Sequence, residues 1–263
     1  MRRAATSVFA AVLACLTLSA CGGSGESLPT FKDAAKGEKV APESFLSALR
    51  SSFRSGSTAV VSFDVRGGAA LRGGGAVRYA DRTMDSDLRI EDWQVSGGSI
   101  DVRTIGGRTY MRVPESRGLW VNLSAGHAGT PGADLADEAD PRKAIKELRA
   151  TIQEVRFSGT ERLSGVPARR YQVVTKPKAK PSAGATPASS RPVVTEYWFN
   201  RDGRVVRRQS EVNDTGSVIF RWSDWGKPVK IARPAPHTVV TLKHLELLRK
   251  KQAAEHAGES TGQ

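Results

Sequence analysis

Residues 57–79 have the sequence STAVVSFDVRGGAALRGGGAVRY, and this stretch decides the fold class. In its first half Val61, Phe63 and Val65 alternate with polar residues. An alternation with a period of two is typical of a strand that is buried on one face. Gly67-Gly68 follows the alternating run, and a second apolar run ends at Tyr79. The stretch therefore predicts two antiparallel strands joined by a glycine turn.

The same pattern recurs along the rest of the chain and indicates many short strands. Two segments, 42–55 and 140–149, have helical spacing of apolar residues instead, and Pro42 and Pro141 suit a first helical turn. An order of helix, strands, helix, strands favours an α+β protein with one large antiparallel sheet and helices on one face. Further strands are predicted at 84–90, 99–105, 109–113, 119–123, 155–163, 168–175, 193–200, 204–212 and 217–222.

The N-terminus has the plan of a lipoprotein signal peptide. Arg2 and Arg3 precede an apolar run, 8–18, that is shorter than the ~20 residues needed to cross a bilayer. Leu18-Ser19-Ala20-Cys21 ends the run and resembles a lipobox, in which the cysteine receives a diacylglyceryl lipid. An ordinary signal would leave a lone free thiol in an oxidising compartment, so lipidation of Cys21 is the favoured interpretation. It predicts a membrane-anchored protein on the extracytoplasmic face.

Composition divides the precursor into four segments. Residues 1–20 are the predicted signal peptide, and 21–41 are a polar, flexible tether. The predicted domain covers 42–236, interrupted by a Pro-, Ala- and Ser-rich insertion at 176–191 that is expected to be disordered. Residues 237–263 are predicted to be an appended tail that is a short helix or disordered.

Charge and motifs narrow the function. The formal charge of +13 favours anionic lipid head groups or wall polymers over nucleic acid outside the cell, although solubility and the Arg-rich usage that accompanies an Ala- and Gly-rich composition account for most of it. The sequence has no GxSxG, HExxH, P-loop or CxxC motif. The expectation is a protein that is not an enzyme, with no catalytic residue, no metal site and no cofactor besides the covalent lipid on Cys21.

Several segments, in serial order, resemble the LppX/LprG-type lipoproteins of actinobacteria, which share a fold with the lipoprotein carrier LolA. The resemblance covers about residues 42–236, and the insertion and the tail depart from it. The matching segments are Ile105-Gly-Gly-Arg-Thr-Tyr-Met-Arg112 with Trp120 and Leu123, Gly159-Thr-Glu-Arg-Leu-Ser-Gly-Val-Pro167 with Arg170-Tyr171, Tyr197-Trp-Phe-Asn-Arg-Asp-Gly-Arg-Val205, and Phe220-Arg-Trp-Ser-Asp-Trp-Gly-Lys-Pro-Val229.

The resemblance implies a half-open barrel wrapped around helices, with an apolar cavity between sheet and helices that binds acylated lipids or glycolipids. Trp120, Trp198 and Trp222 are candidates for the lining of that cavity, and core packing is the alternative for each. Two functions stay open. One is binding or transfer of acylated lipids in the cell envelope, and the other is a closed-core module for interaction with an envelope protein or for sensing.

Overall fold

The computed structural model describes residues 31–67, 71–81, 83–92, 98–123, 141–176, 192–212, 216–247 and 250. The predicted signal peptide, Cys21, residues 22–30 of the predicted tether and nearly all of the 176–191 insertion lie outside these residues.

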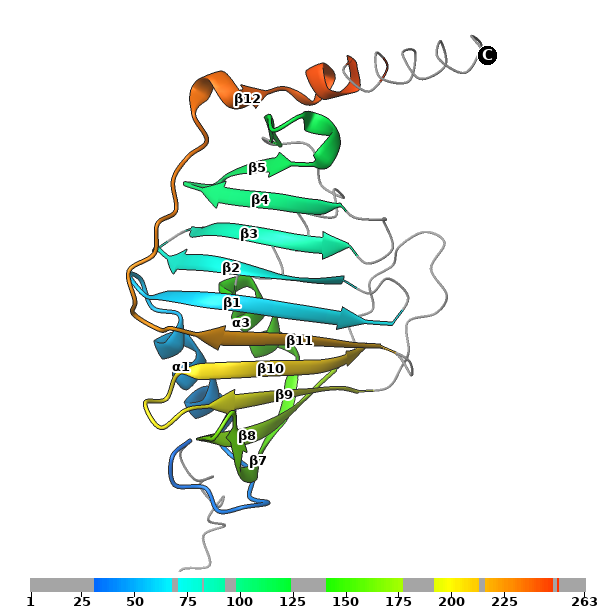
Figure 1. Cartoon of the computed structure of the whole chain (residues 1–263). Coiled ribbons are helices and arrows are strands. Elements are labelled where there is room, and N and C mark those ends of the chain that lie inside the picture. Colours follow the sequence, from blue (N-terminus) through cyan, green and yellow to red (C-terminus); the bar gives the residue numbers. More distant parts are fainter. Residues whose placement is uncertain are drawn as a thin grey trace, which may run out of the picture.

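Twelve strands form one open sheet, in the order β12-β6-β5-β4-β3-β2-β1-β11-β10-β9-β8-β7 (Figure 1). All neighbouring strands are antiparallel except β12 and β6, which are parallel. The strands are β1 (Thr58–Arg66), β2 (Leu71–Tyr79), β3 (Met84–Asp92), β4 (Ser99–Ile105), β5 (Arg108–Arg112), β6 (Trp120–Asn122), β7 (Ile152–Leu163), β8 (Val166–Thr175), β9 (Val193–Phe199), β10 (Val205–Val212), β11 (Gly216–Ser223) and β12 (Val239–Val240).

The sheet consists of two meanders that meet at the pairing of β1 with β11. Strands β1 to β6 extend from this pair in one direction, and β10 to β7 extend in the other. The predicted α+β class and the large curved sheet with helices on its concave face are confirmed, and the parallel pairing of β12 is an addition to the expected antiparallel pattern.

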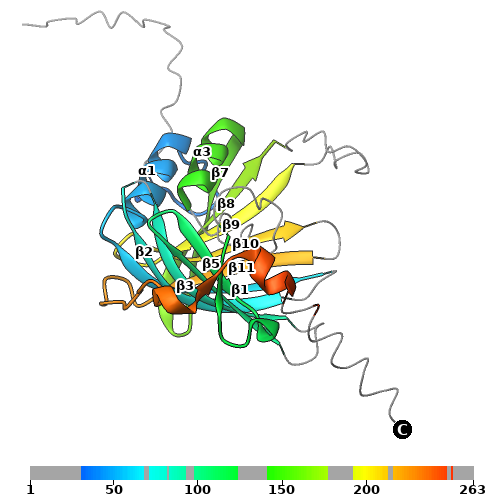
Figure 2. The same cartoon turned by 90° about the horizontal axis from the view of Figure 1, so that it is seen from above.

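Two helices lie side by side on one face of the sheet (Figure 2). Helix α1 (Pro42–Ser52) buries Phe45, Leu46 and Leu49, and α3 (Pro141–Thr151) buries Pro141, Ile145 and Leu148. The apolar positions recur every three or four residues, so each helix presents one stripe to the sheet. Two short 3-10 turns, η1 (Pro114–Ser116) and η2 (Pro236–Thr238), complete the named elements.

Glycines in β2 make room for a large side chain and for a close strand contact. A Cβ atom on Gly73 would lie 2.6 Å from Cζ of Phe63 on β1, whose ring is buried. A Cβ atom on Gly75 would lie 1.9 Å from the carbonyl oxygen of Asp87 on β3. The triplet Gly73-Gly74-Gly75 is therefore a paired part of β2 that lets neighbours approach closely.

The fold extends beyond both predicted domain boundaries. Phe31 and Val40 are buried in the core, although both lie in the predicted 21–41 tether. Phe31 stacks on Tyr171 with ring centroids 4.5 Å apart, and the Tyr171 hydroxyl donates to the Phe31 carbonyl oxygen at 2.5 Å. At the other end, Leu245 is only 1% exposed and belongs to the same core. Phe31 stands alone among polar residues, so no periodic pattern in the sequence predicts its burial.

Candidate functional site

The face of the sheet under the two helices, here the inner face, follows from strand register. Residues paired across neighbouring strands point to the same face. Phe63 of β1 pairs with Phe220 of β11, which pairs with Arg208 of β10, which pairs with Tyr197 of β9. Phe45 of α1 contacts Tyr197 with ring centroids 5.3 Å apart, so this row is the one that faces the helices.

A cavity lies between α3 and this row, and we call it the inner cavity. Its volume is about 20 Å³. A ligand pocket ordinarily has roughly 300–1,000 Å³, so the inner cavity has no room for an acyl chain with α3 in this position. The lining residues are Leu49, Pro141, Ala144, Ile145, Leu148, Tyr197, Arg208, Phe220 and Trp222.

Arg208 is the charged side chain among these lining residues. Its guanidinium carbon lies 5.7 Å from the centroid of the Phe220 ring, and its Nε is buried with no hydrogen-bond partner. Among the described residues no carboxylate pairs with Arg208. Burial raises the pKa of the neighbouring Tyr197 hydroxyl, and the charge of Arg208 acts in the opposite direction. A guanidinium nitrogen that is buried without a partner is costly, and it suits an anionic or carbonyl-bearing ligand.

Of the three tryptophans predicted to line a cavity, Trp222 lines the inner cavity. It is inside because it pairs with Val61, on the same face as Phe63. Its indole Nε1 donates to the hydroxyl oxygen of Tyr79 at 3.1 Å, and its ring centroid lies 5.7 Å from that of Phe53, the residue after α1. Trp222 is therefore both a core residue and a lining residue of the inner cavity.

Trp198 lies on the opposite, outer face, contrary to its predicted place in a cavity. It is the sequence neighbour of the inward residue Tyr197 and pairs with Arg207 and Arg170. Its Nε1 donates to Oε1 of Glu161 at 2.7 Å, and the Arg207 guanidinium lies 4.7 Å from its ring centroid. Trp198 is 2% exposed because charged side chains cover it, which is a structural role.

Trp120 is also on the outer face, because its neighbour Val121 pairs with Met111 on the inner side. Arg103 and Arg112 lie over its ring at 4.6 and 4.8 Å from the centroid. Both arginines are held in place by carboxylates, since Arg112 pairs with Asp101 at 2.7 Å and Arg103 with Asp87 at 2.9 Å. Trp120 packs beneath this ion-pair row and does not line the inner cavity.

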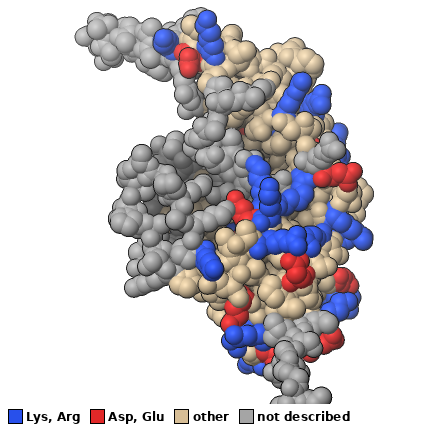
Figure 3. Space-filling view, turned by 180° about the vertical axis from the view of Figure 1, so that it is seen from behind, with Lys and Arg blue, Asp and Glu red and all other residues tan. Residues whose placement is uncertain are grey.

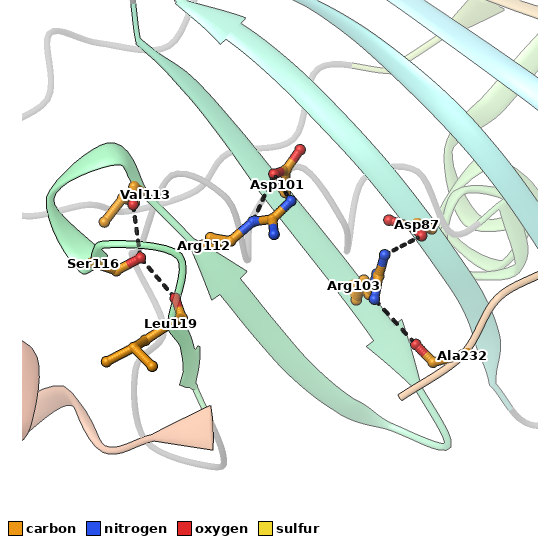
Figure 4. Close-up of polar contacts among 8 residues, drawn as sticks. All are labelled: Asp87, Asp101, Arg103, Arg112, Val113, Ser116, Leu119 and Ala232. Carbon is orange, nitrogen blue, oxygen red and sulfur yellow. Dashed lines mark hydrogen bonds and ion pairs between the residues drawn. The ribbon is translucent and has the colours of Figure 1, made fainter. Parts of the chain in front are cut away.

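The close-up in Figure 4 shows how this outer row connects to the C-terminal segment. Arg103 Nη1 donates to the carbonyl oxygen of Ala232 at 3.4 Å. The Ser116 hydroxyl lies at the nearby η1 turn, 2.7 Å from the carbonyl oxygens of both Val113 and Leu119, and donates its single hydrogen to one of them. These hydrogen bonds hold chain segments together.

A second, larger cleft lies between the two helices and was missed by sequence reasoning. We call it the interhelical cleft; its volume is about 390 Å³, and it is lined by Arg50, Phe53, Arg142, Ile145, Lys146 and Arg149. The cations of α3 at positions 142, 146 and 149 share one stripe at helical spacing, which is the signal that could have revealed it. Without the position of α1, that stripe resembles an ordinary solvated face.

Two further classes of site are lacking in the described part of the chain. No group of three or more His, Cys, Asp or Glu side chains is placed to hold a metal ion there. None of the helices described is both long enough and apolar enough to span a bilayer.

Of the comparisons with known proteins, the one with solved structures finds similar folds. No family model and no curated protein matches the sequence. The crystal structure of the lipoprotein LppX of Mycobacterium tuberculosis matches with a TM-score of 0.50 and 17% identity, over 73% of this chain and 100% of that chain. LprF of Mycobacterium bovis matches with a TM-score of 0.44 and 16% identity, over 74% of this chain and 97% of that one. MucB matches with a TM-score of 0.40 and 18% identity, over 74% and 61%.

The chain therefore has the half-open, LolA-like fold that the sequence resemblance implies. The fold is that of LppX, which the chain matches over that protein's whole length at low sequence identity.

Proposed function

We propose that this protein is an envelope lipoprotein, anchored through a lipid on Cys21, that binds an acylated lipid between α3 and the inner face of the sheet. The observation that carries the proposal is Arg208, which lines the inner cavity beside apolar rings and whose buried Nε has no hydrogen-bond partner. Its guanidinium would donate to ester carbonyl or anionic oxygens of the lipid, while Phe220 and Trp222 would contact the acyl chain. The fold shared with LppX supports this arrangement.

Binding requires a movement of α3. The inner cavity of about 20 Å³ must grow by more than tenfold to reach the lower end of the usual ligand-pocket range. Helix α3 is the element to move, because its Ala144, Ile145 and Leu148 form the wall opposite the sheet. A bound lipid would stabilise the displaced position of α3, because it makes more contacts with the protein in that position than in the closed one.

The small inner cavity favours a second candidate function. A core filled to this extent is also what a closed interaction module would have, with the surface rather than the interior contacting an envelope partner. The two candidates differ in what the purified protein carries.

Native mass spectrometry with lipid extraction tests the proposal. The chain from residue 22 to 263 retains every core residue from Phe31 to Leu245 and lacks the acylated cysteine, so any lipid found is bound non-covalently. Exported from an actinobacterial host, it is expected to carry an acyl lipid, and Arg208→Met is expected to lose most of it. A clean apo mass that persists after incubation with envelope lipids would favour the closed module.

A further inference from the structure

The interhelical cleft has a surplus of positive charge. Four of its six lining residues are cations, Arg50 from α1 and three from α3. The carboxylate of Glu43 lies nearby and is shared, 3.2 Å from Arg149 and 3.7 Å from Arg50. Among the described residues no carboxylate pairs with Lys146. Figure 3, which views the helix side, shows Lys and Arg side chains gathered over this layer.

The floor of the cleft is apolar. Phe53 and Ile145 are 6% and 8% exposed, so only a small part of each side chain contributes to the floor of the cleft, below the cations. A site with cations at the rim and apolar atoms below matches an amphiphile with an anionic group next to hydrocarbon. A free metal cation or a basic peptide would be repelled by the same charges.

Ile145 connects the cleft to the proposed lipid site. Its side chain lines both the interhelical cleft and the inner cavity. A shift of α3 that opens the inner cavity would also move this side chain, and would join the two spaces. The cations would then lie at the entrance of one continuous site.

We propose that the interhelical cleft binds the phosphate head group of an anionic phospholipid whose acyl chain passes Ile145 into the inner cavity. This inference rests on the proposed function and specifies its ligand class. The phosphate oxygens would accept from Arg50, Lys146 and Arg149, whose charges Glu43 only partly neutralises. The ester carbonyls would accept from Arg208.

The test is native mass spectrometry of the full lipidated chain, released from nonionic detergent micelles that contain one added lipid. The probes are dioleoylphosphatidylglycerol and dioleoylphosphatidylcholine, which share acyl chains and differ in net charge. The expected result is about fivefold or greater preference for the anionic lipid, since one cation beside an anionic lipid contributes ~1 kcal/mol. Lys146→Gln should lower the preference, and Lys146→Glu, which reverses the charge, should abolish it.

Arg221→Glu is the matched control, because it makes the same charge change at an exposed residue on the outer face. This variant should keep the preference for phosphatidylglycerol. Equal binding of both lipids by the parent, a preference retained in Lys146→Glu, or full displacement of phosphatidylglycerol by equimolar inorganic phosphate would overturn the head-group inference and leave the lipid-binding function standing. Binding of neither lipid would overturn both.

Discussion

At the scale of single residues, the two adjacent arginines of β10 have opposite surroundings. Arg208 points to the inner face and Arg207 to the outer face, and the Nε of each is buried without a hydrogen-bond partner. The outward guanidinium lies over Trp198, and its Nη2 donates to Oε1 of Gln209 at 2.6 Å. One side chain is thus a candidate for ligand contact, and the other stabilises the sheet.

Substituting each arginine by methionine should separate these roles. Arg208→Met removes a poorly satisfied cation from an apolar site, so the free energy of unfolding should stay within ~1 kcal/mol or rise. Arg207→Met loses a hydrogen bond and a cation–π contact, which should lower the free energy of unfolding by about 1–2 kcal/mol. Urea denaturation followed by circular dichroism measures both. A larger loss in Arg208→Met than in Arg207→Met would make Arg208 a structural residue.

Tyr197 should give the fold a dependence on alkaline pH. Burial raises the pKa of its hydroxyl above the ordinary value of 10.0. Because the unfolded chain ionises first, the stabilisation is complete below pH 10 and is lost as the pH rises toward the folded-state pKa. The midpoint of urea unfolding should therefore fall above pH 10, and Tyr197→Phe should make that fall shallower. The pKa of Tyr171 is raised for the same reason, so part of the slope should remain.

At the scale of elements, β2 depends on the absence of side chains at its centre. An alanine at Gly73 would place Cβ 2.4 Å from the Arg89 carbonyl oxygen on β3 and 2.6 Å from the Phe63 ring. Gly73→Ala should therefore lower the free energy of unfolding by about 1–3 kcal/mol through overpacking. Ser62→Ala, at an exposed position of the adjacent strand, should change it by less than ~0.5 kcal/mol. Equal melting temperatures for the two variants would contradict this account of the glycine.

The helix pair shows how one element takes part in two sites. Helix α3 buries Ile145 and Leu148 against the sheet and presents Arg142, Lys146 and Arg149 to the cleft beside α1. Its apolar stripe is enough to predict a helix on a sheet. Its basic stripe lines a cleft only because α1 packs beside it, and α1 comes from a segment about 100 residues earlier in the chain.

At the scale of the whole molecule, the C-terminal segment completes the fold. After β11 the chain passes along the ends of the strands to β12, which pairs with β6 (Figure 1). Trp225 Nε1 donates to the Val205 carbonyl oxygen at 2.9 Å, and Gly226 N donates to the Thr58 carbonyl oxygen at 2.9 Å. Residues beyond the predicted boundary at 236 therefore belong to the same body as the sheet.

Two leucines in this segment provide a matched test. Leu245→Ala should lower the free energy of unfolding by about 2–5 kcal/mol, because Leu245 is buried in the core. Leu247 is 57% exposed, so Leu247→Ala should change it by less than ~0.5 kcal/mol. Thermal unfolding of both variants measures the difference. If Leu245→Ala melted with the parent, residues 237–263 would be an appended tail as the composition suggested.

The sequence by itself determined the strands, the two helices and the fold class. Alternation along 57–79 and the later runs depends on local burial of one strand face, which a linear pattern records directly. Serial order of short segments then identified the LolA-like fold, which the match to LppX confirms.

Only the tertiary structure decided which residues meet. The face on which a tryptophan lies depends on register, and a shift of one residue reverses it; thus Trp222 faces the helices, while Trp198 and Trp120 face arginines on the other side. The burial of Phe31 and Leu245, the isolation of Arg208 and the basic cleft between α1 and α3 all arise from contacts between distant segments. A pattern within one segment, such as the basic stripe of α3, does not show which residues meet, because each residue's partner is supplied by another part of the chain.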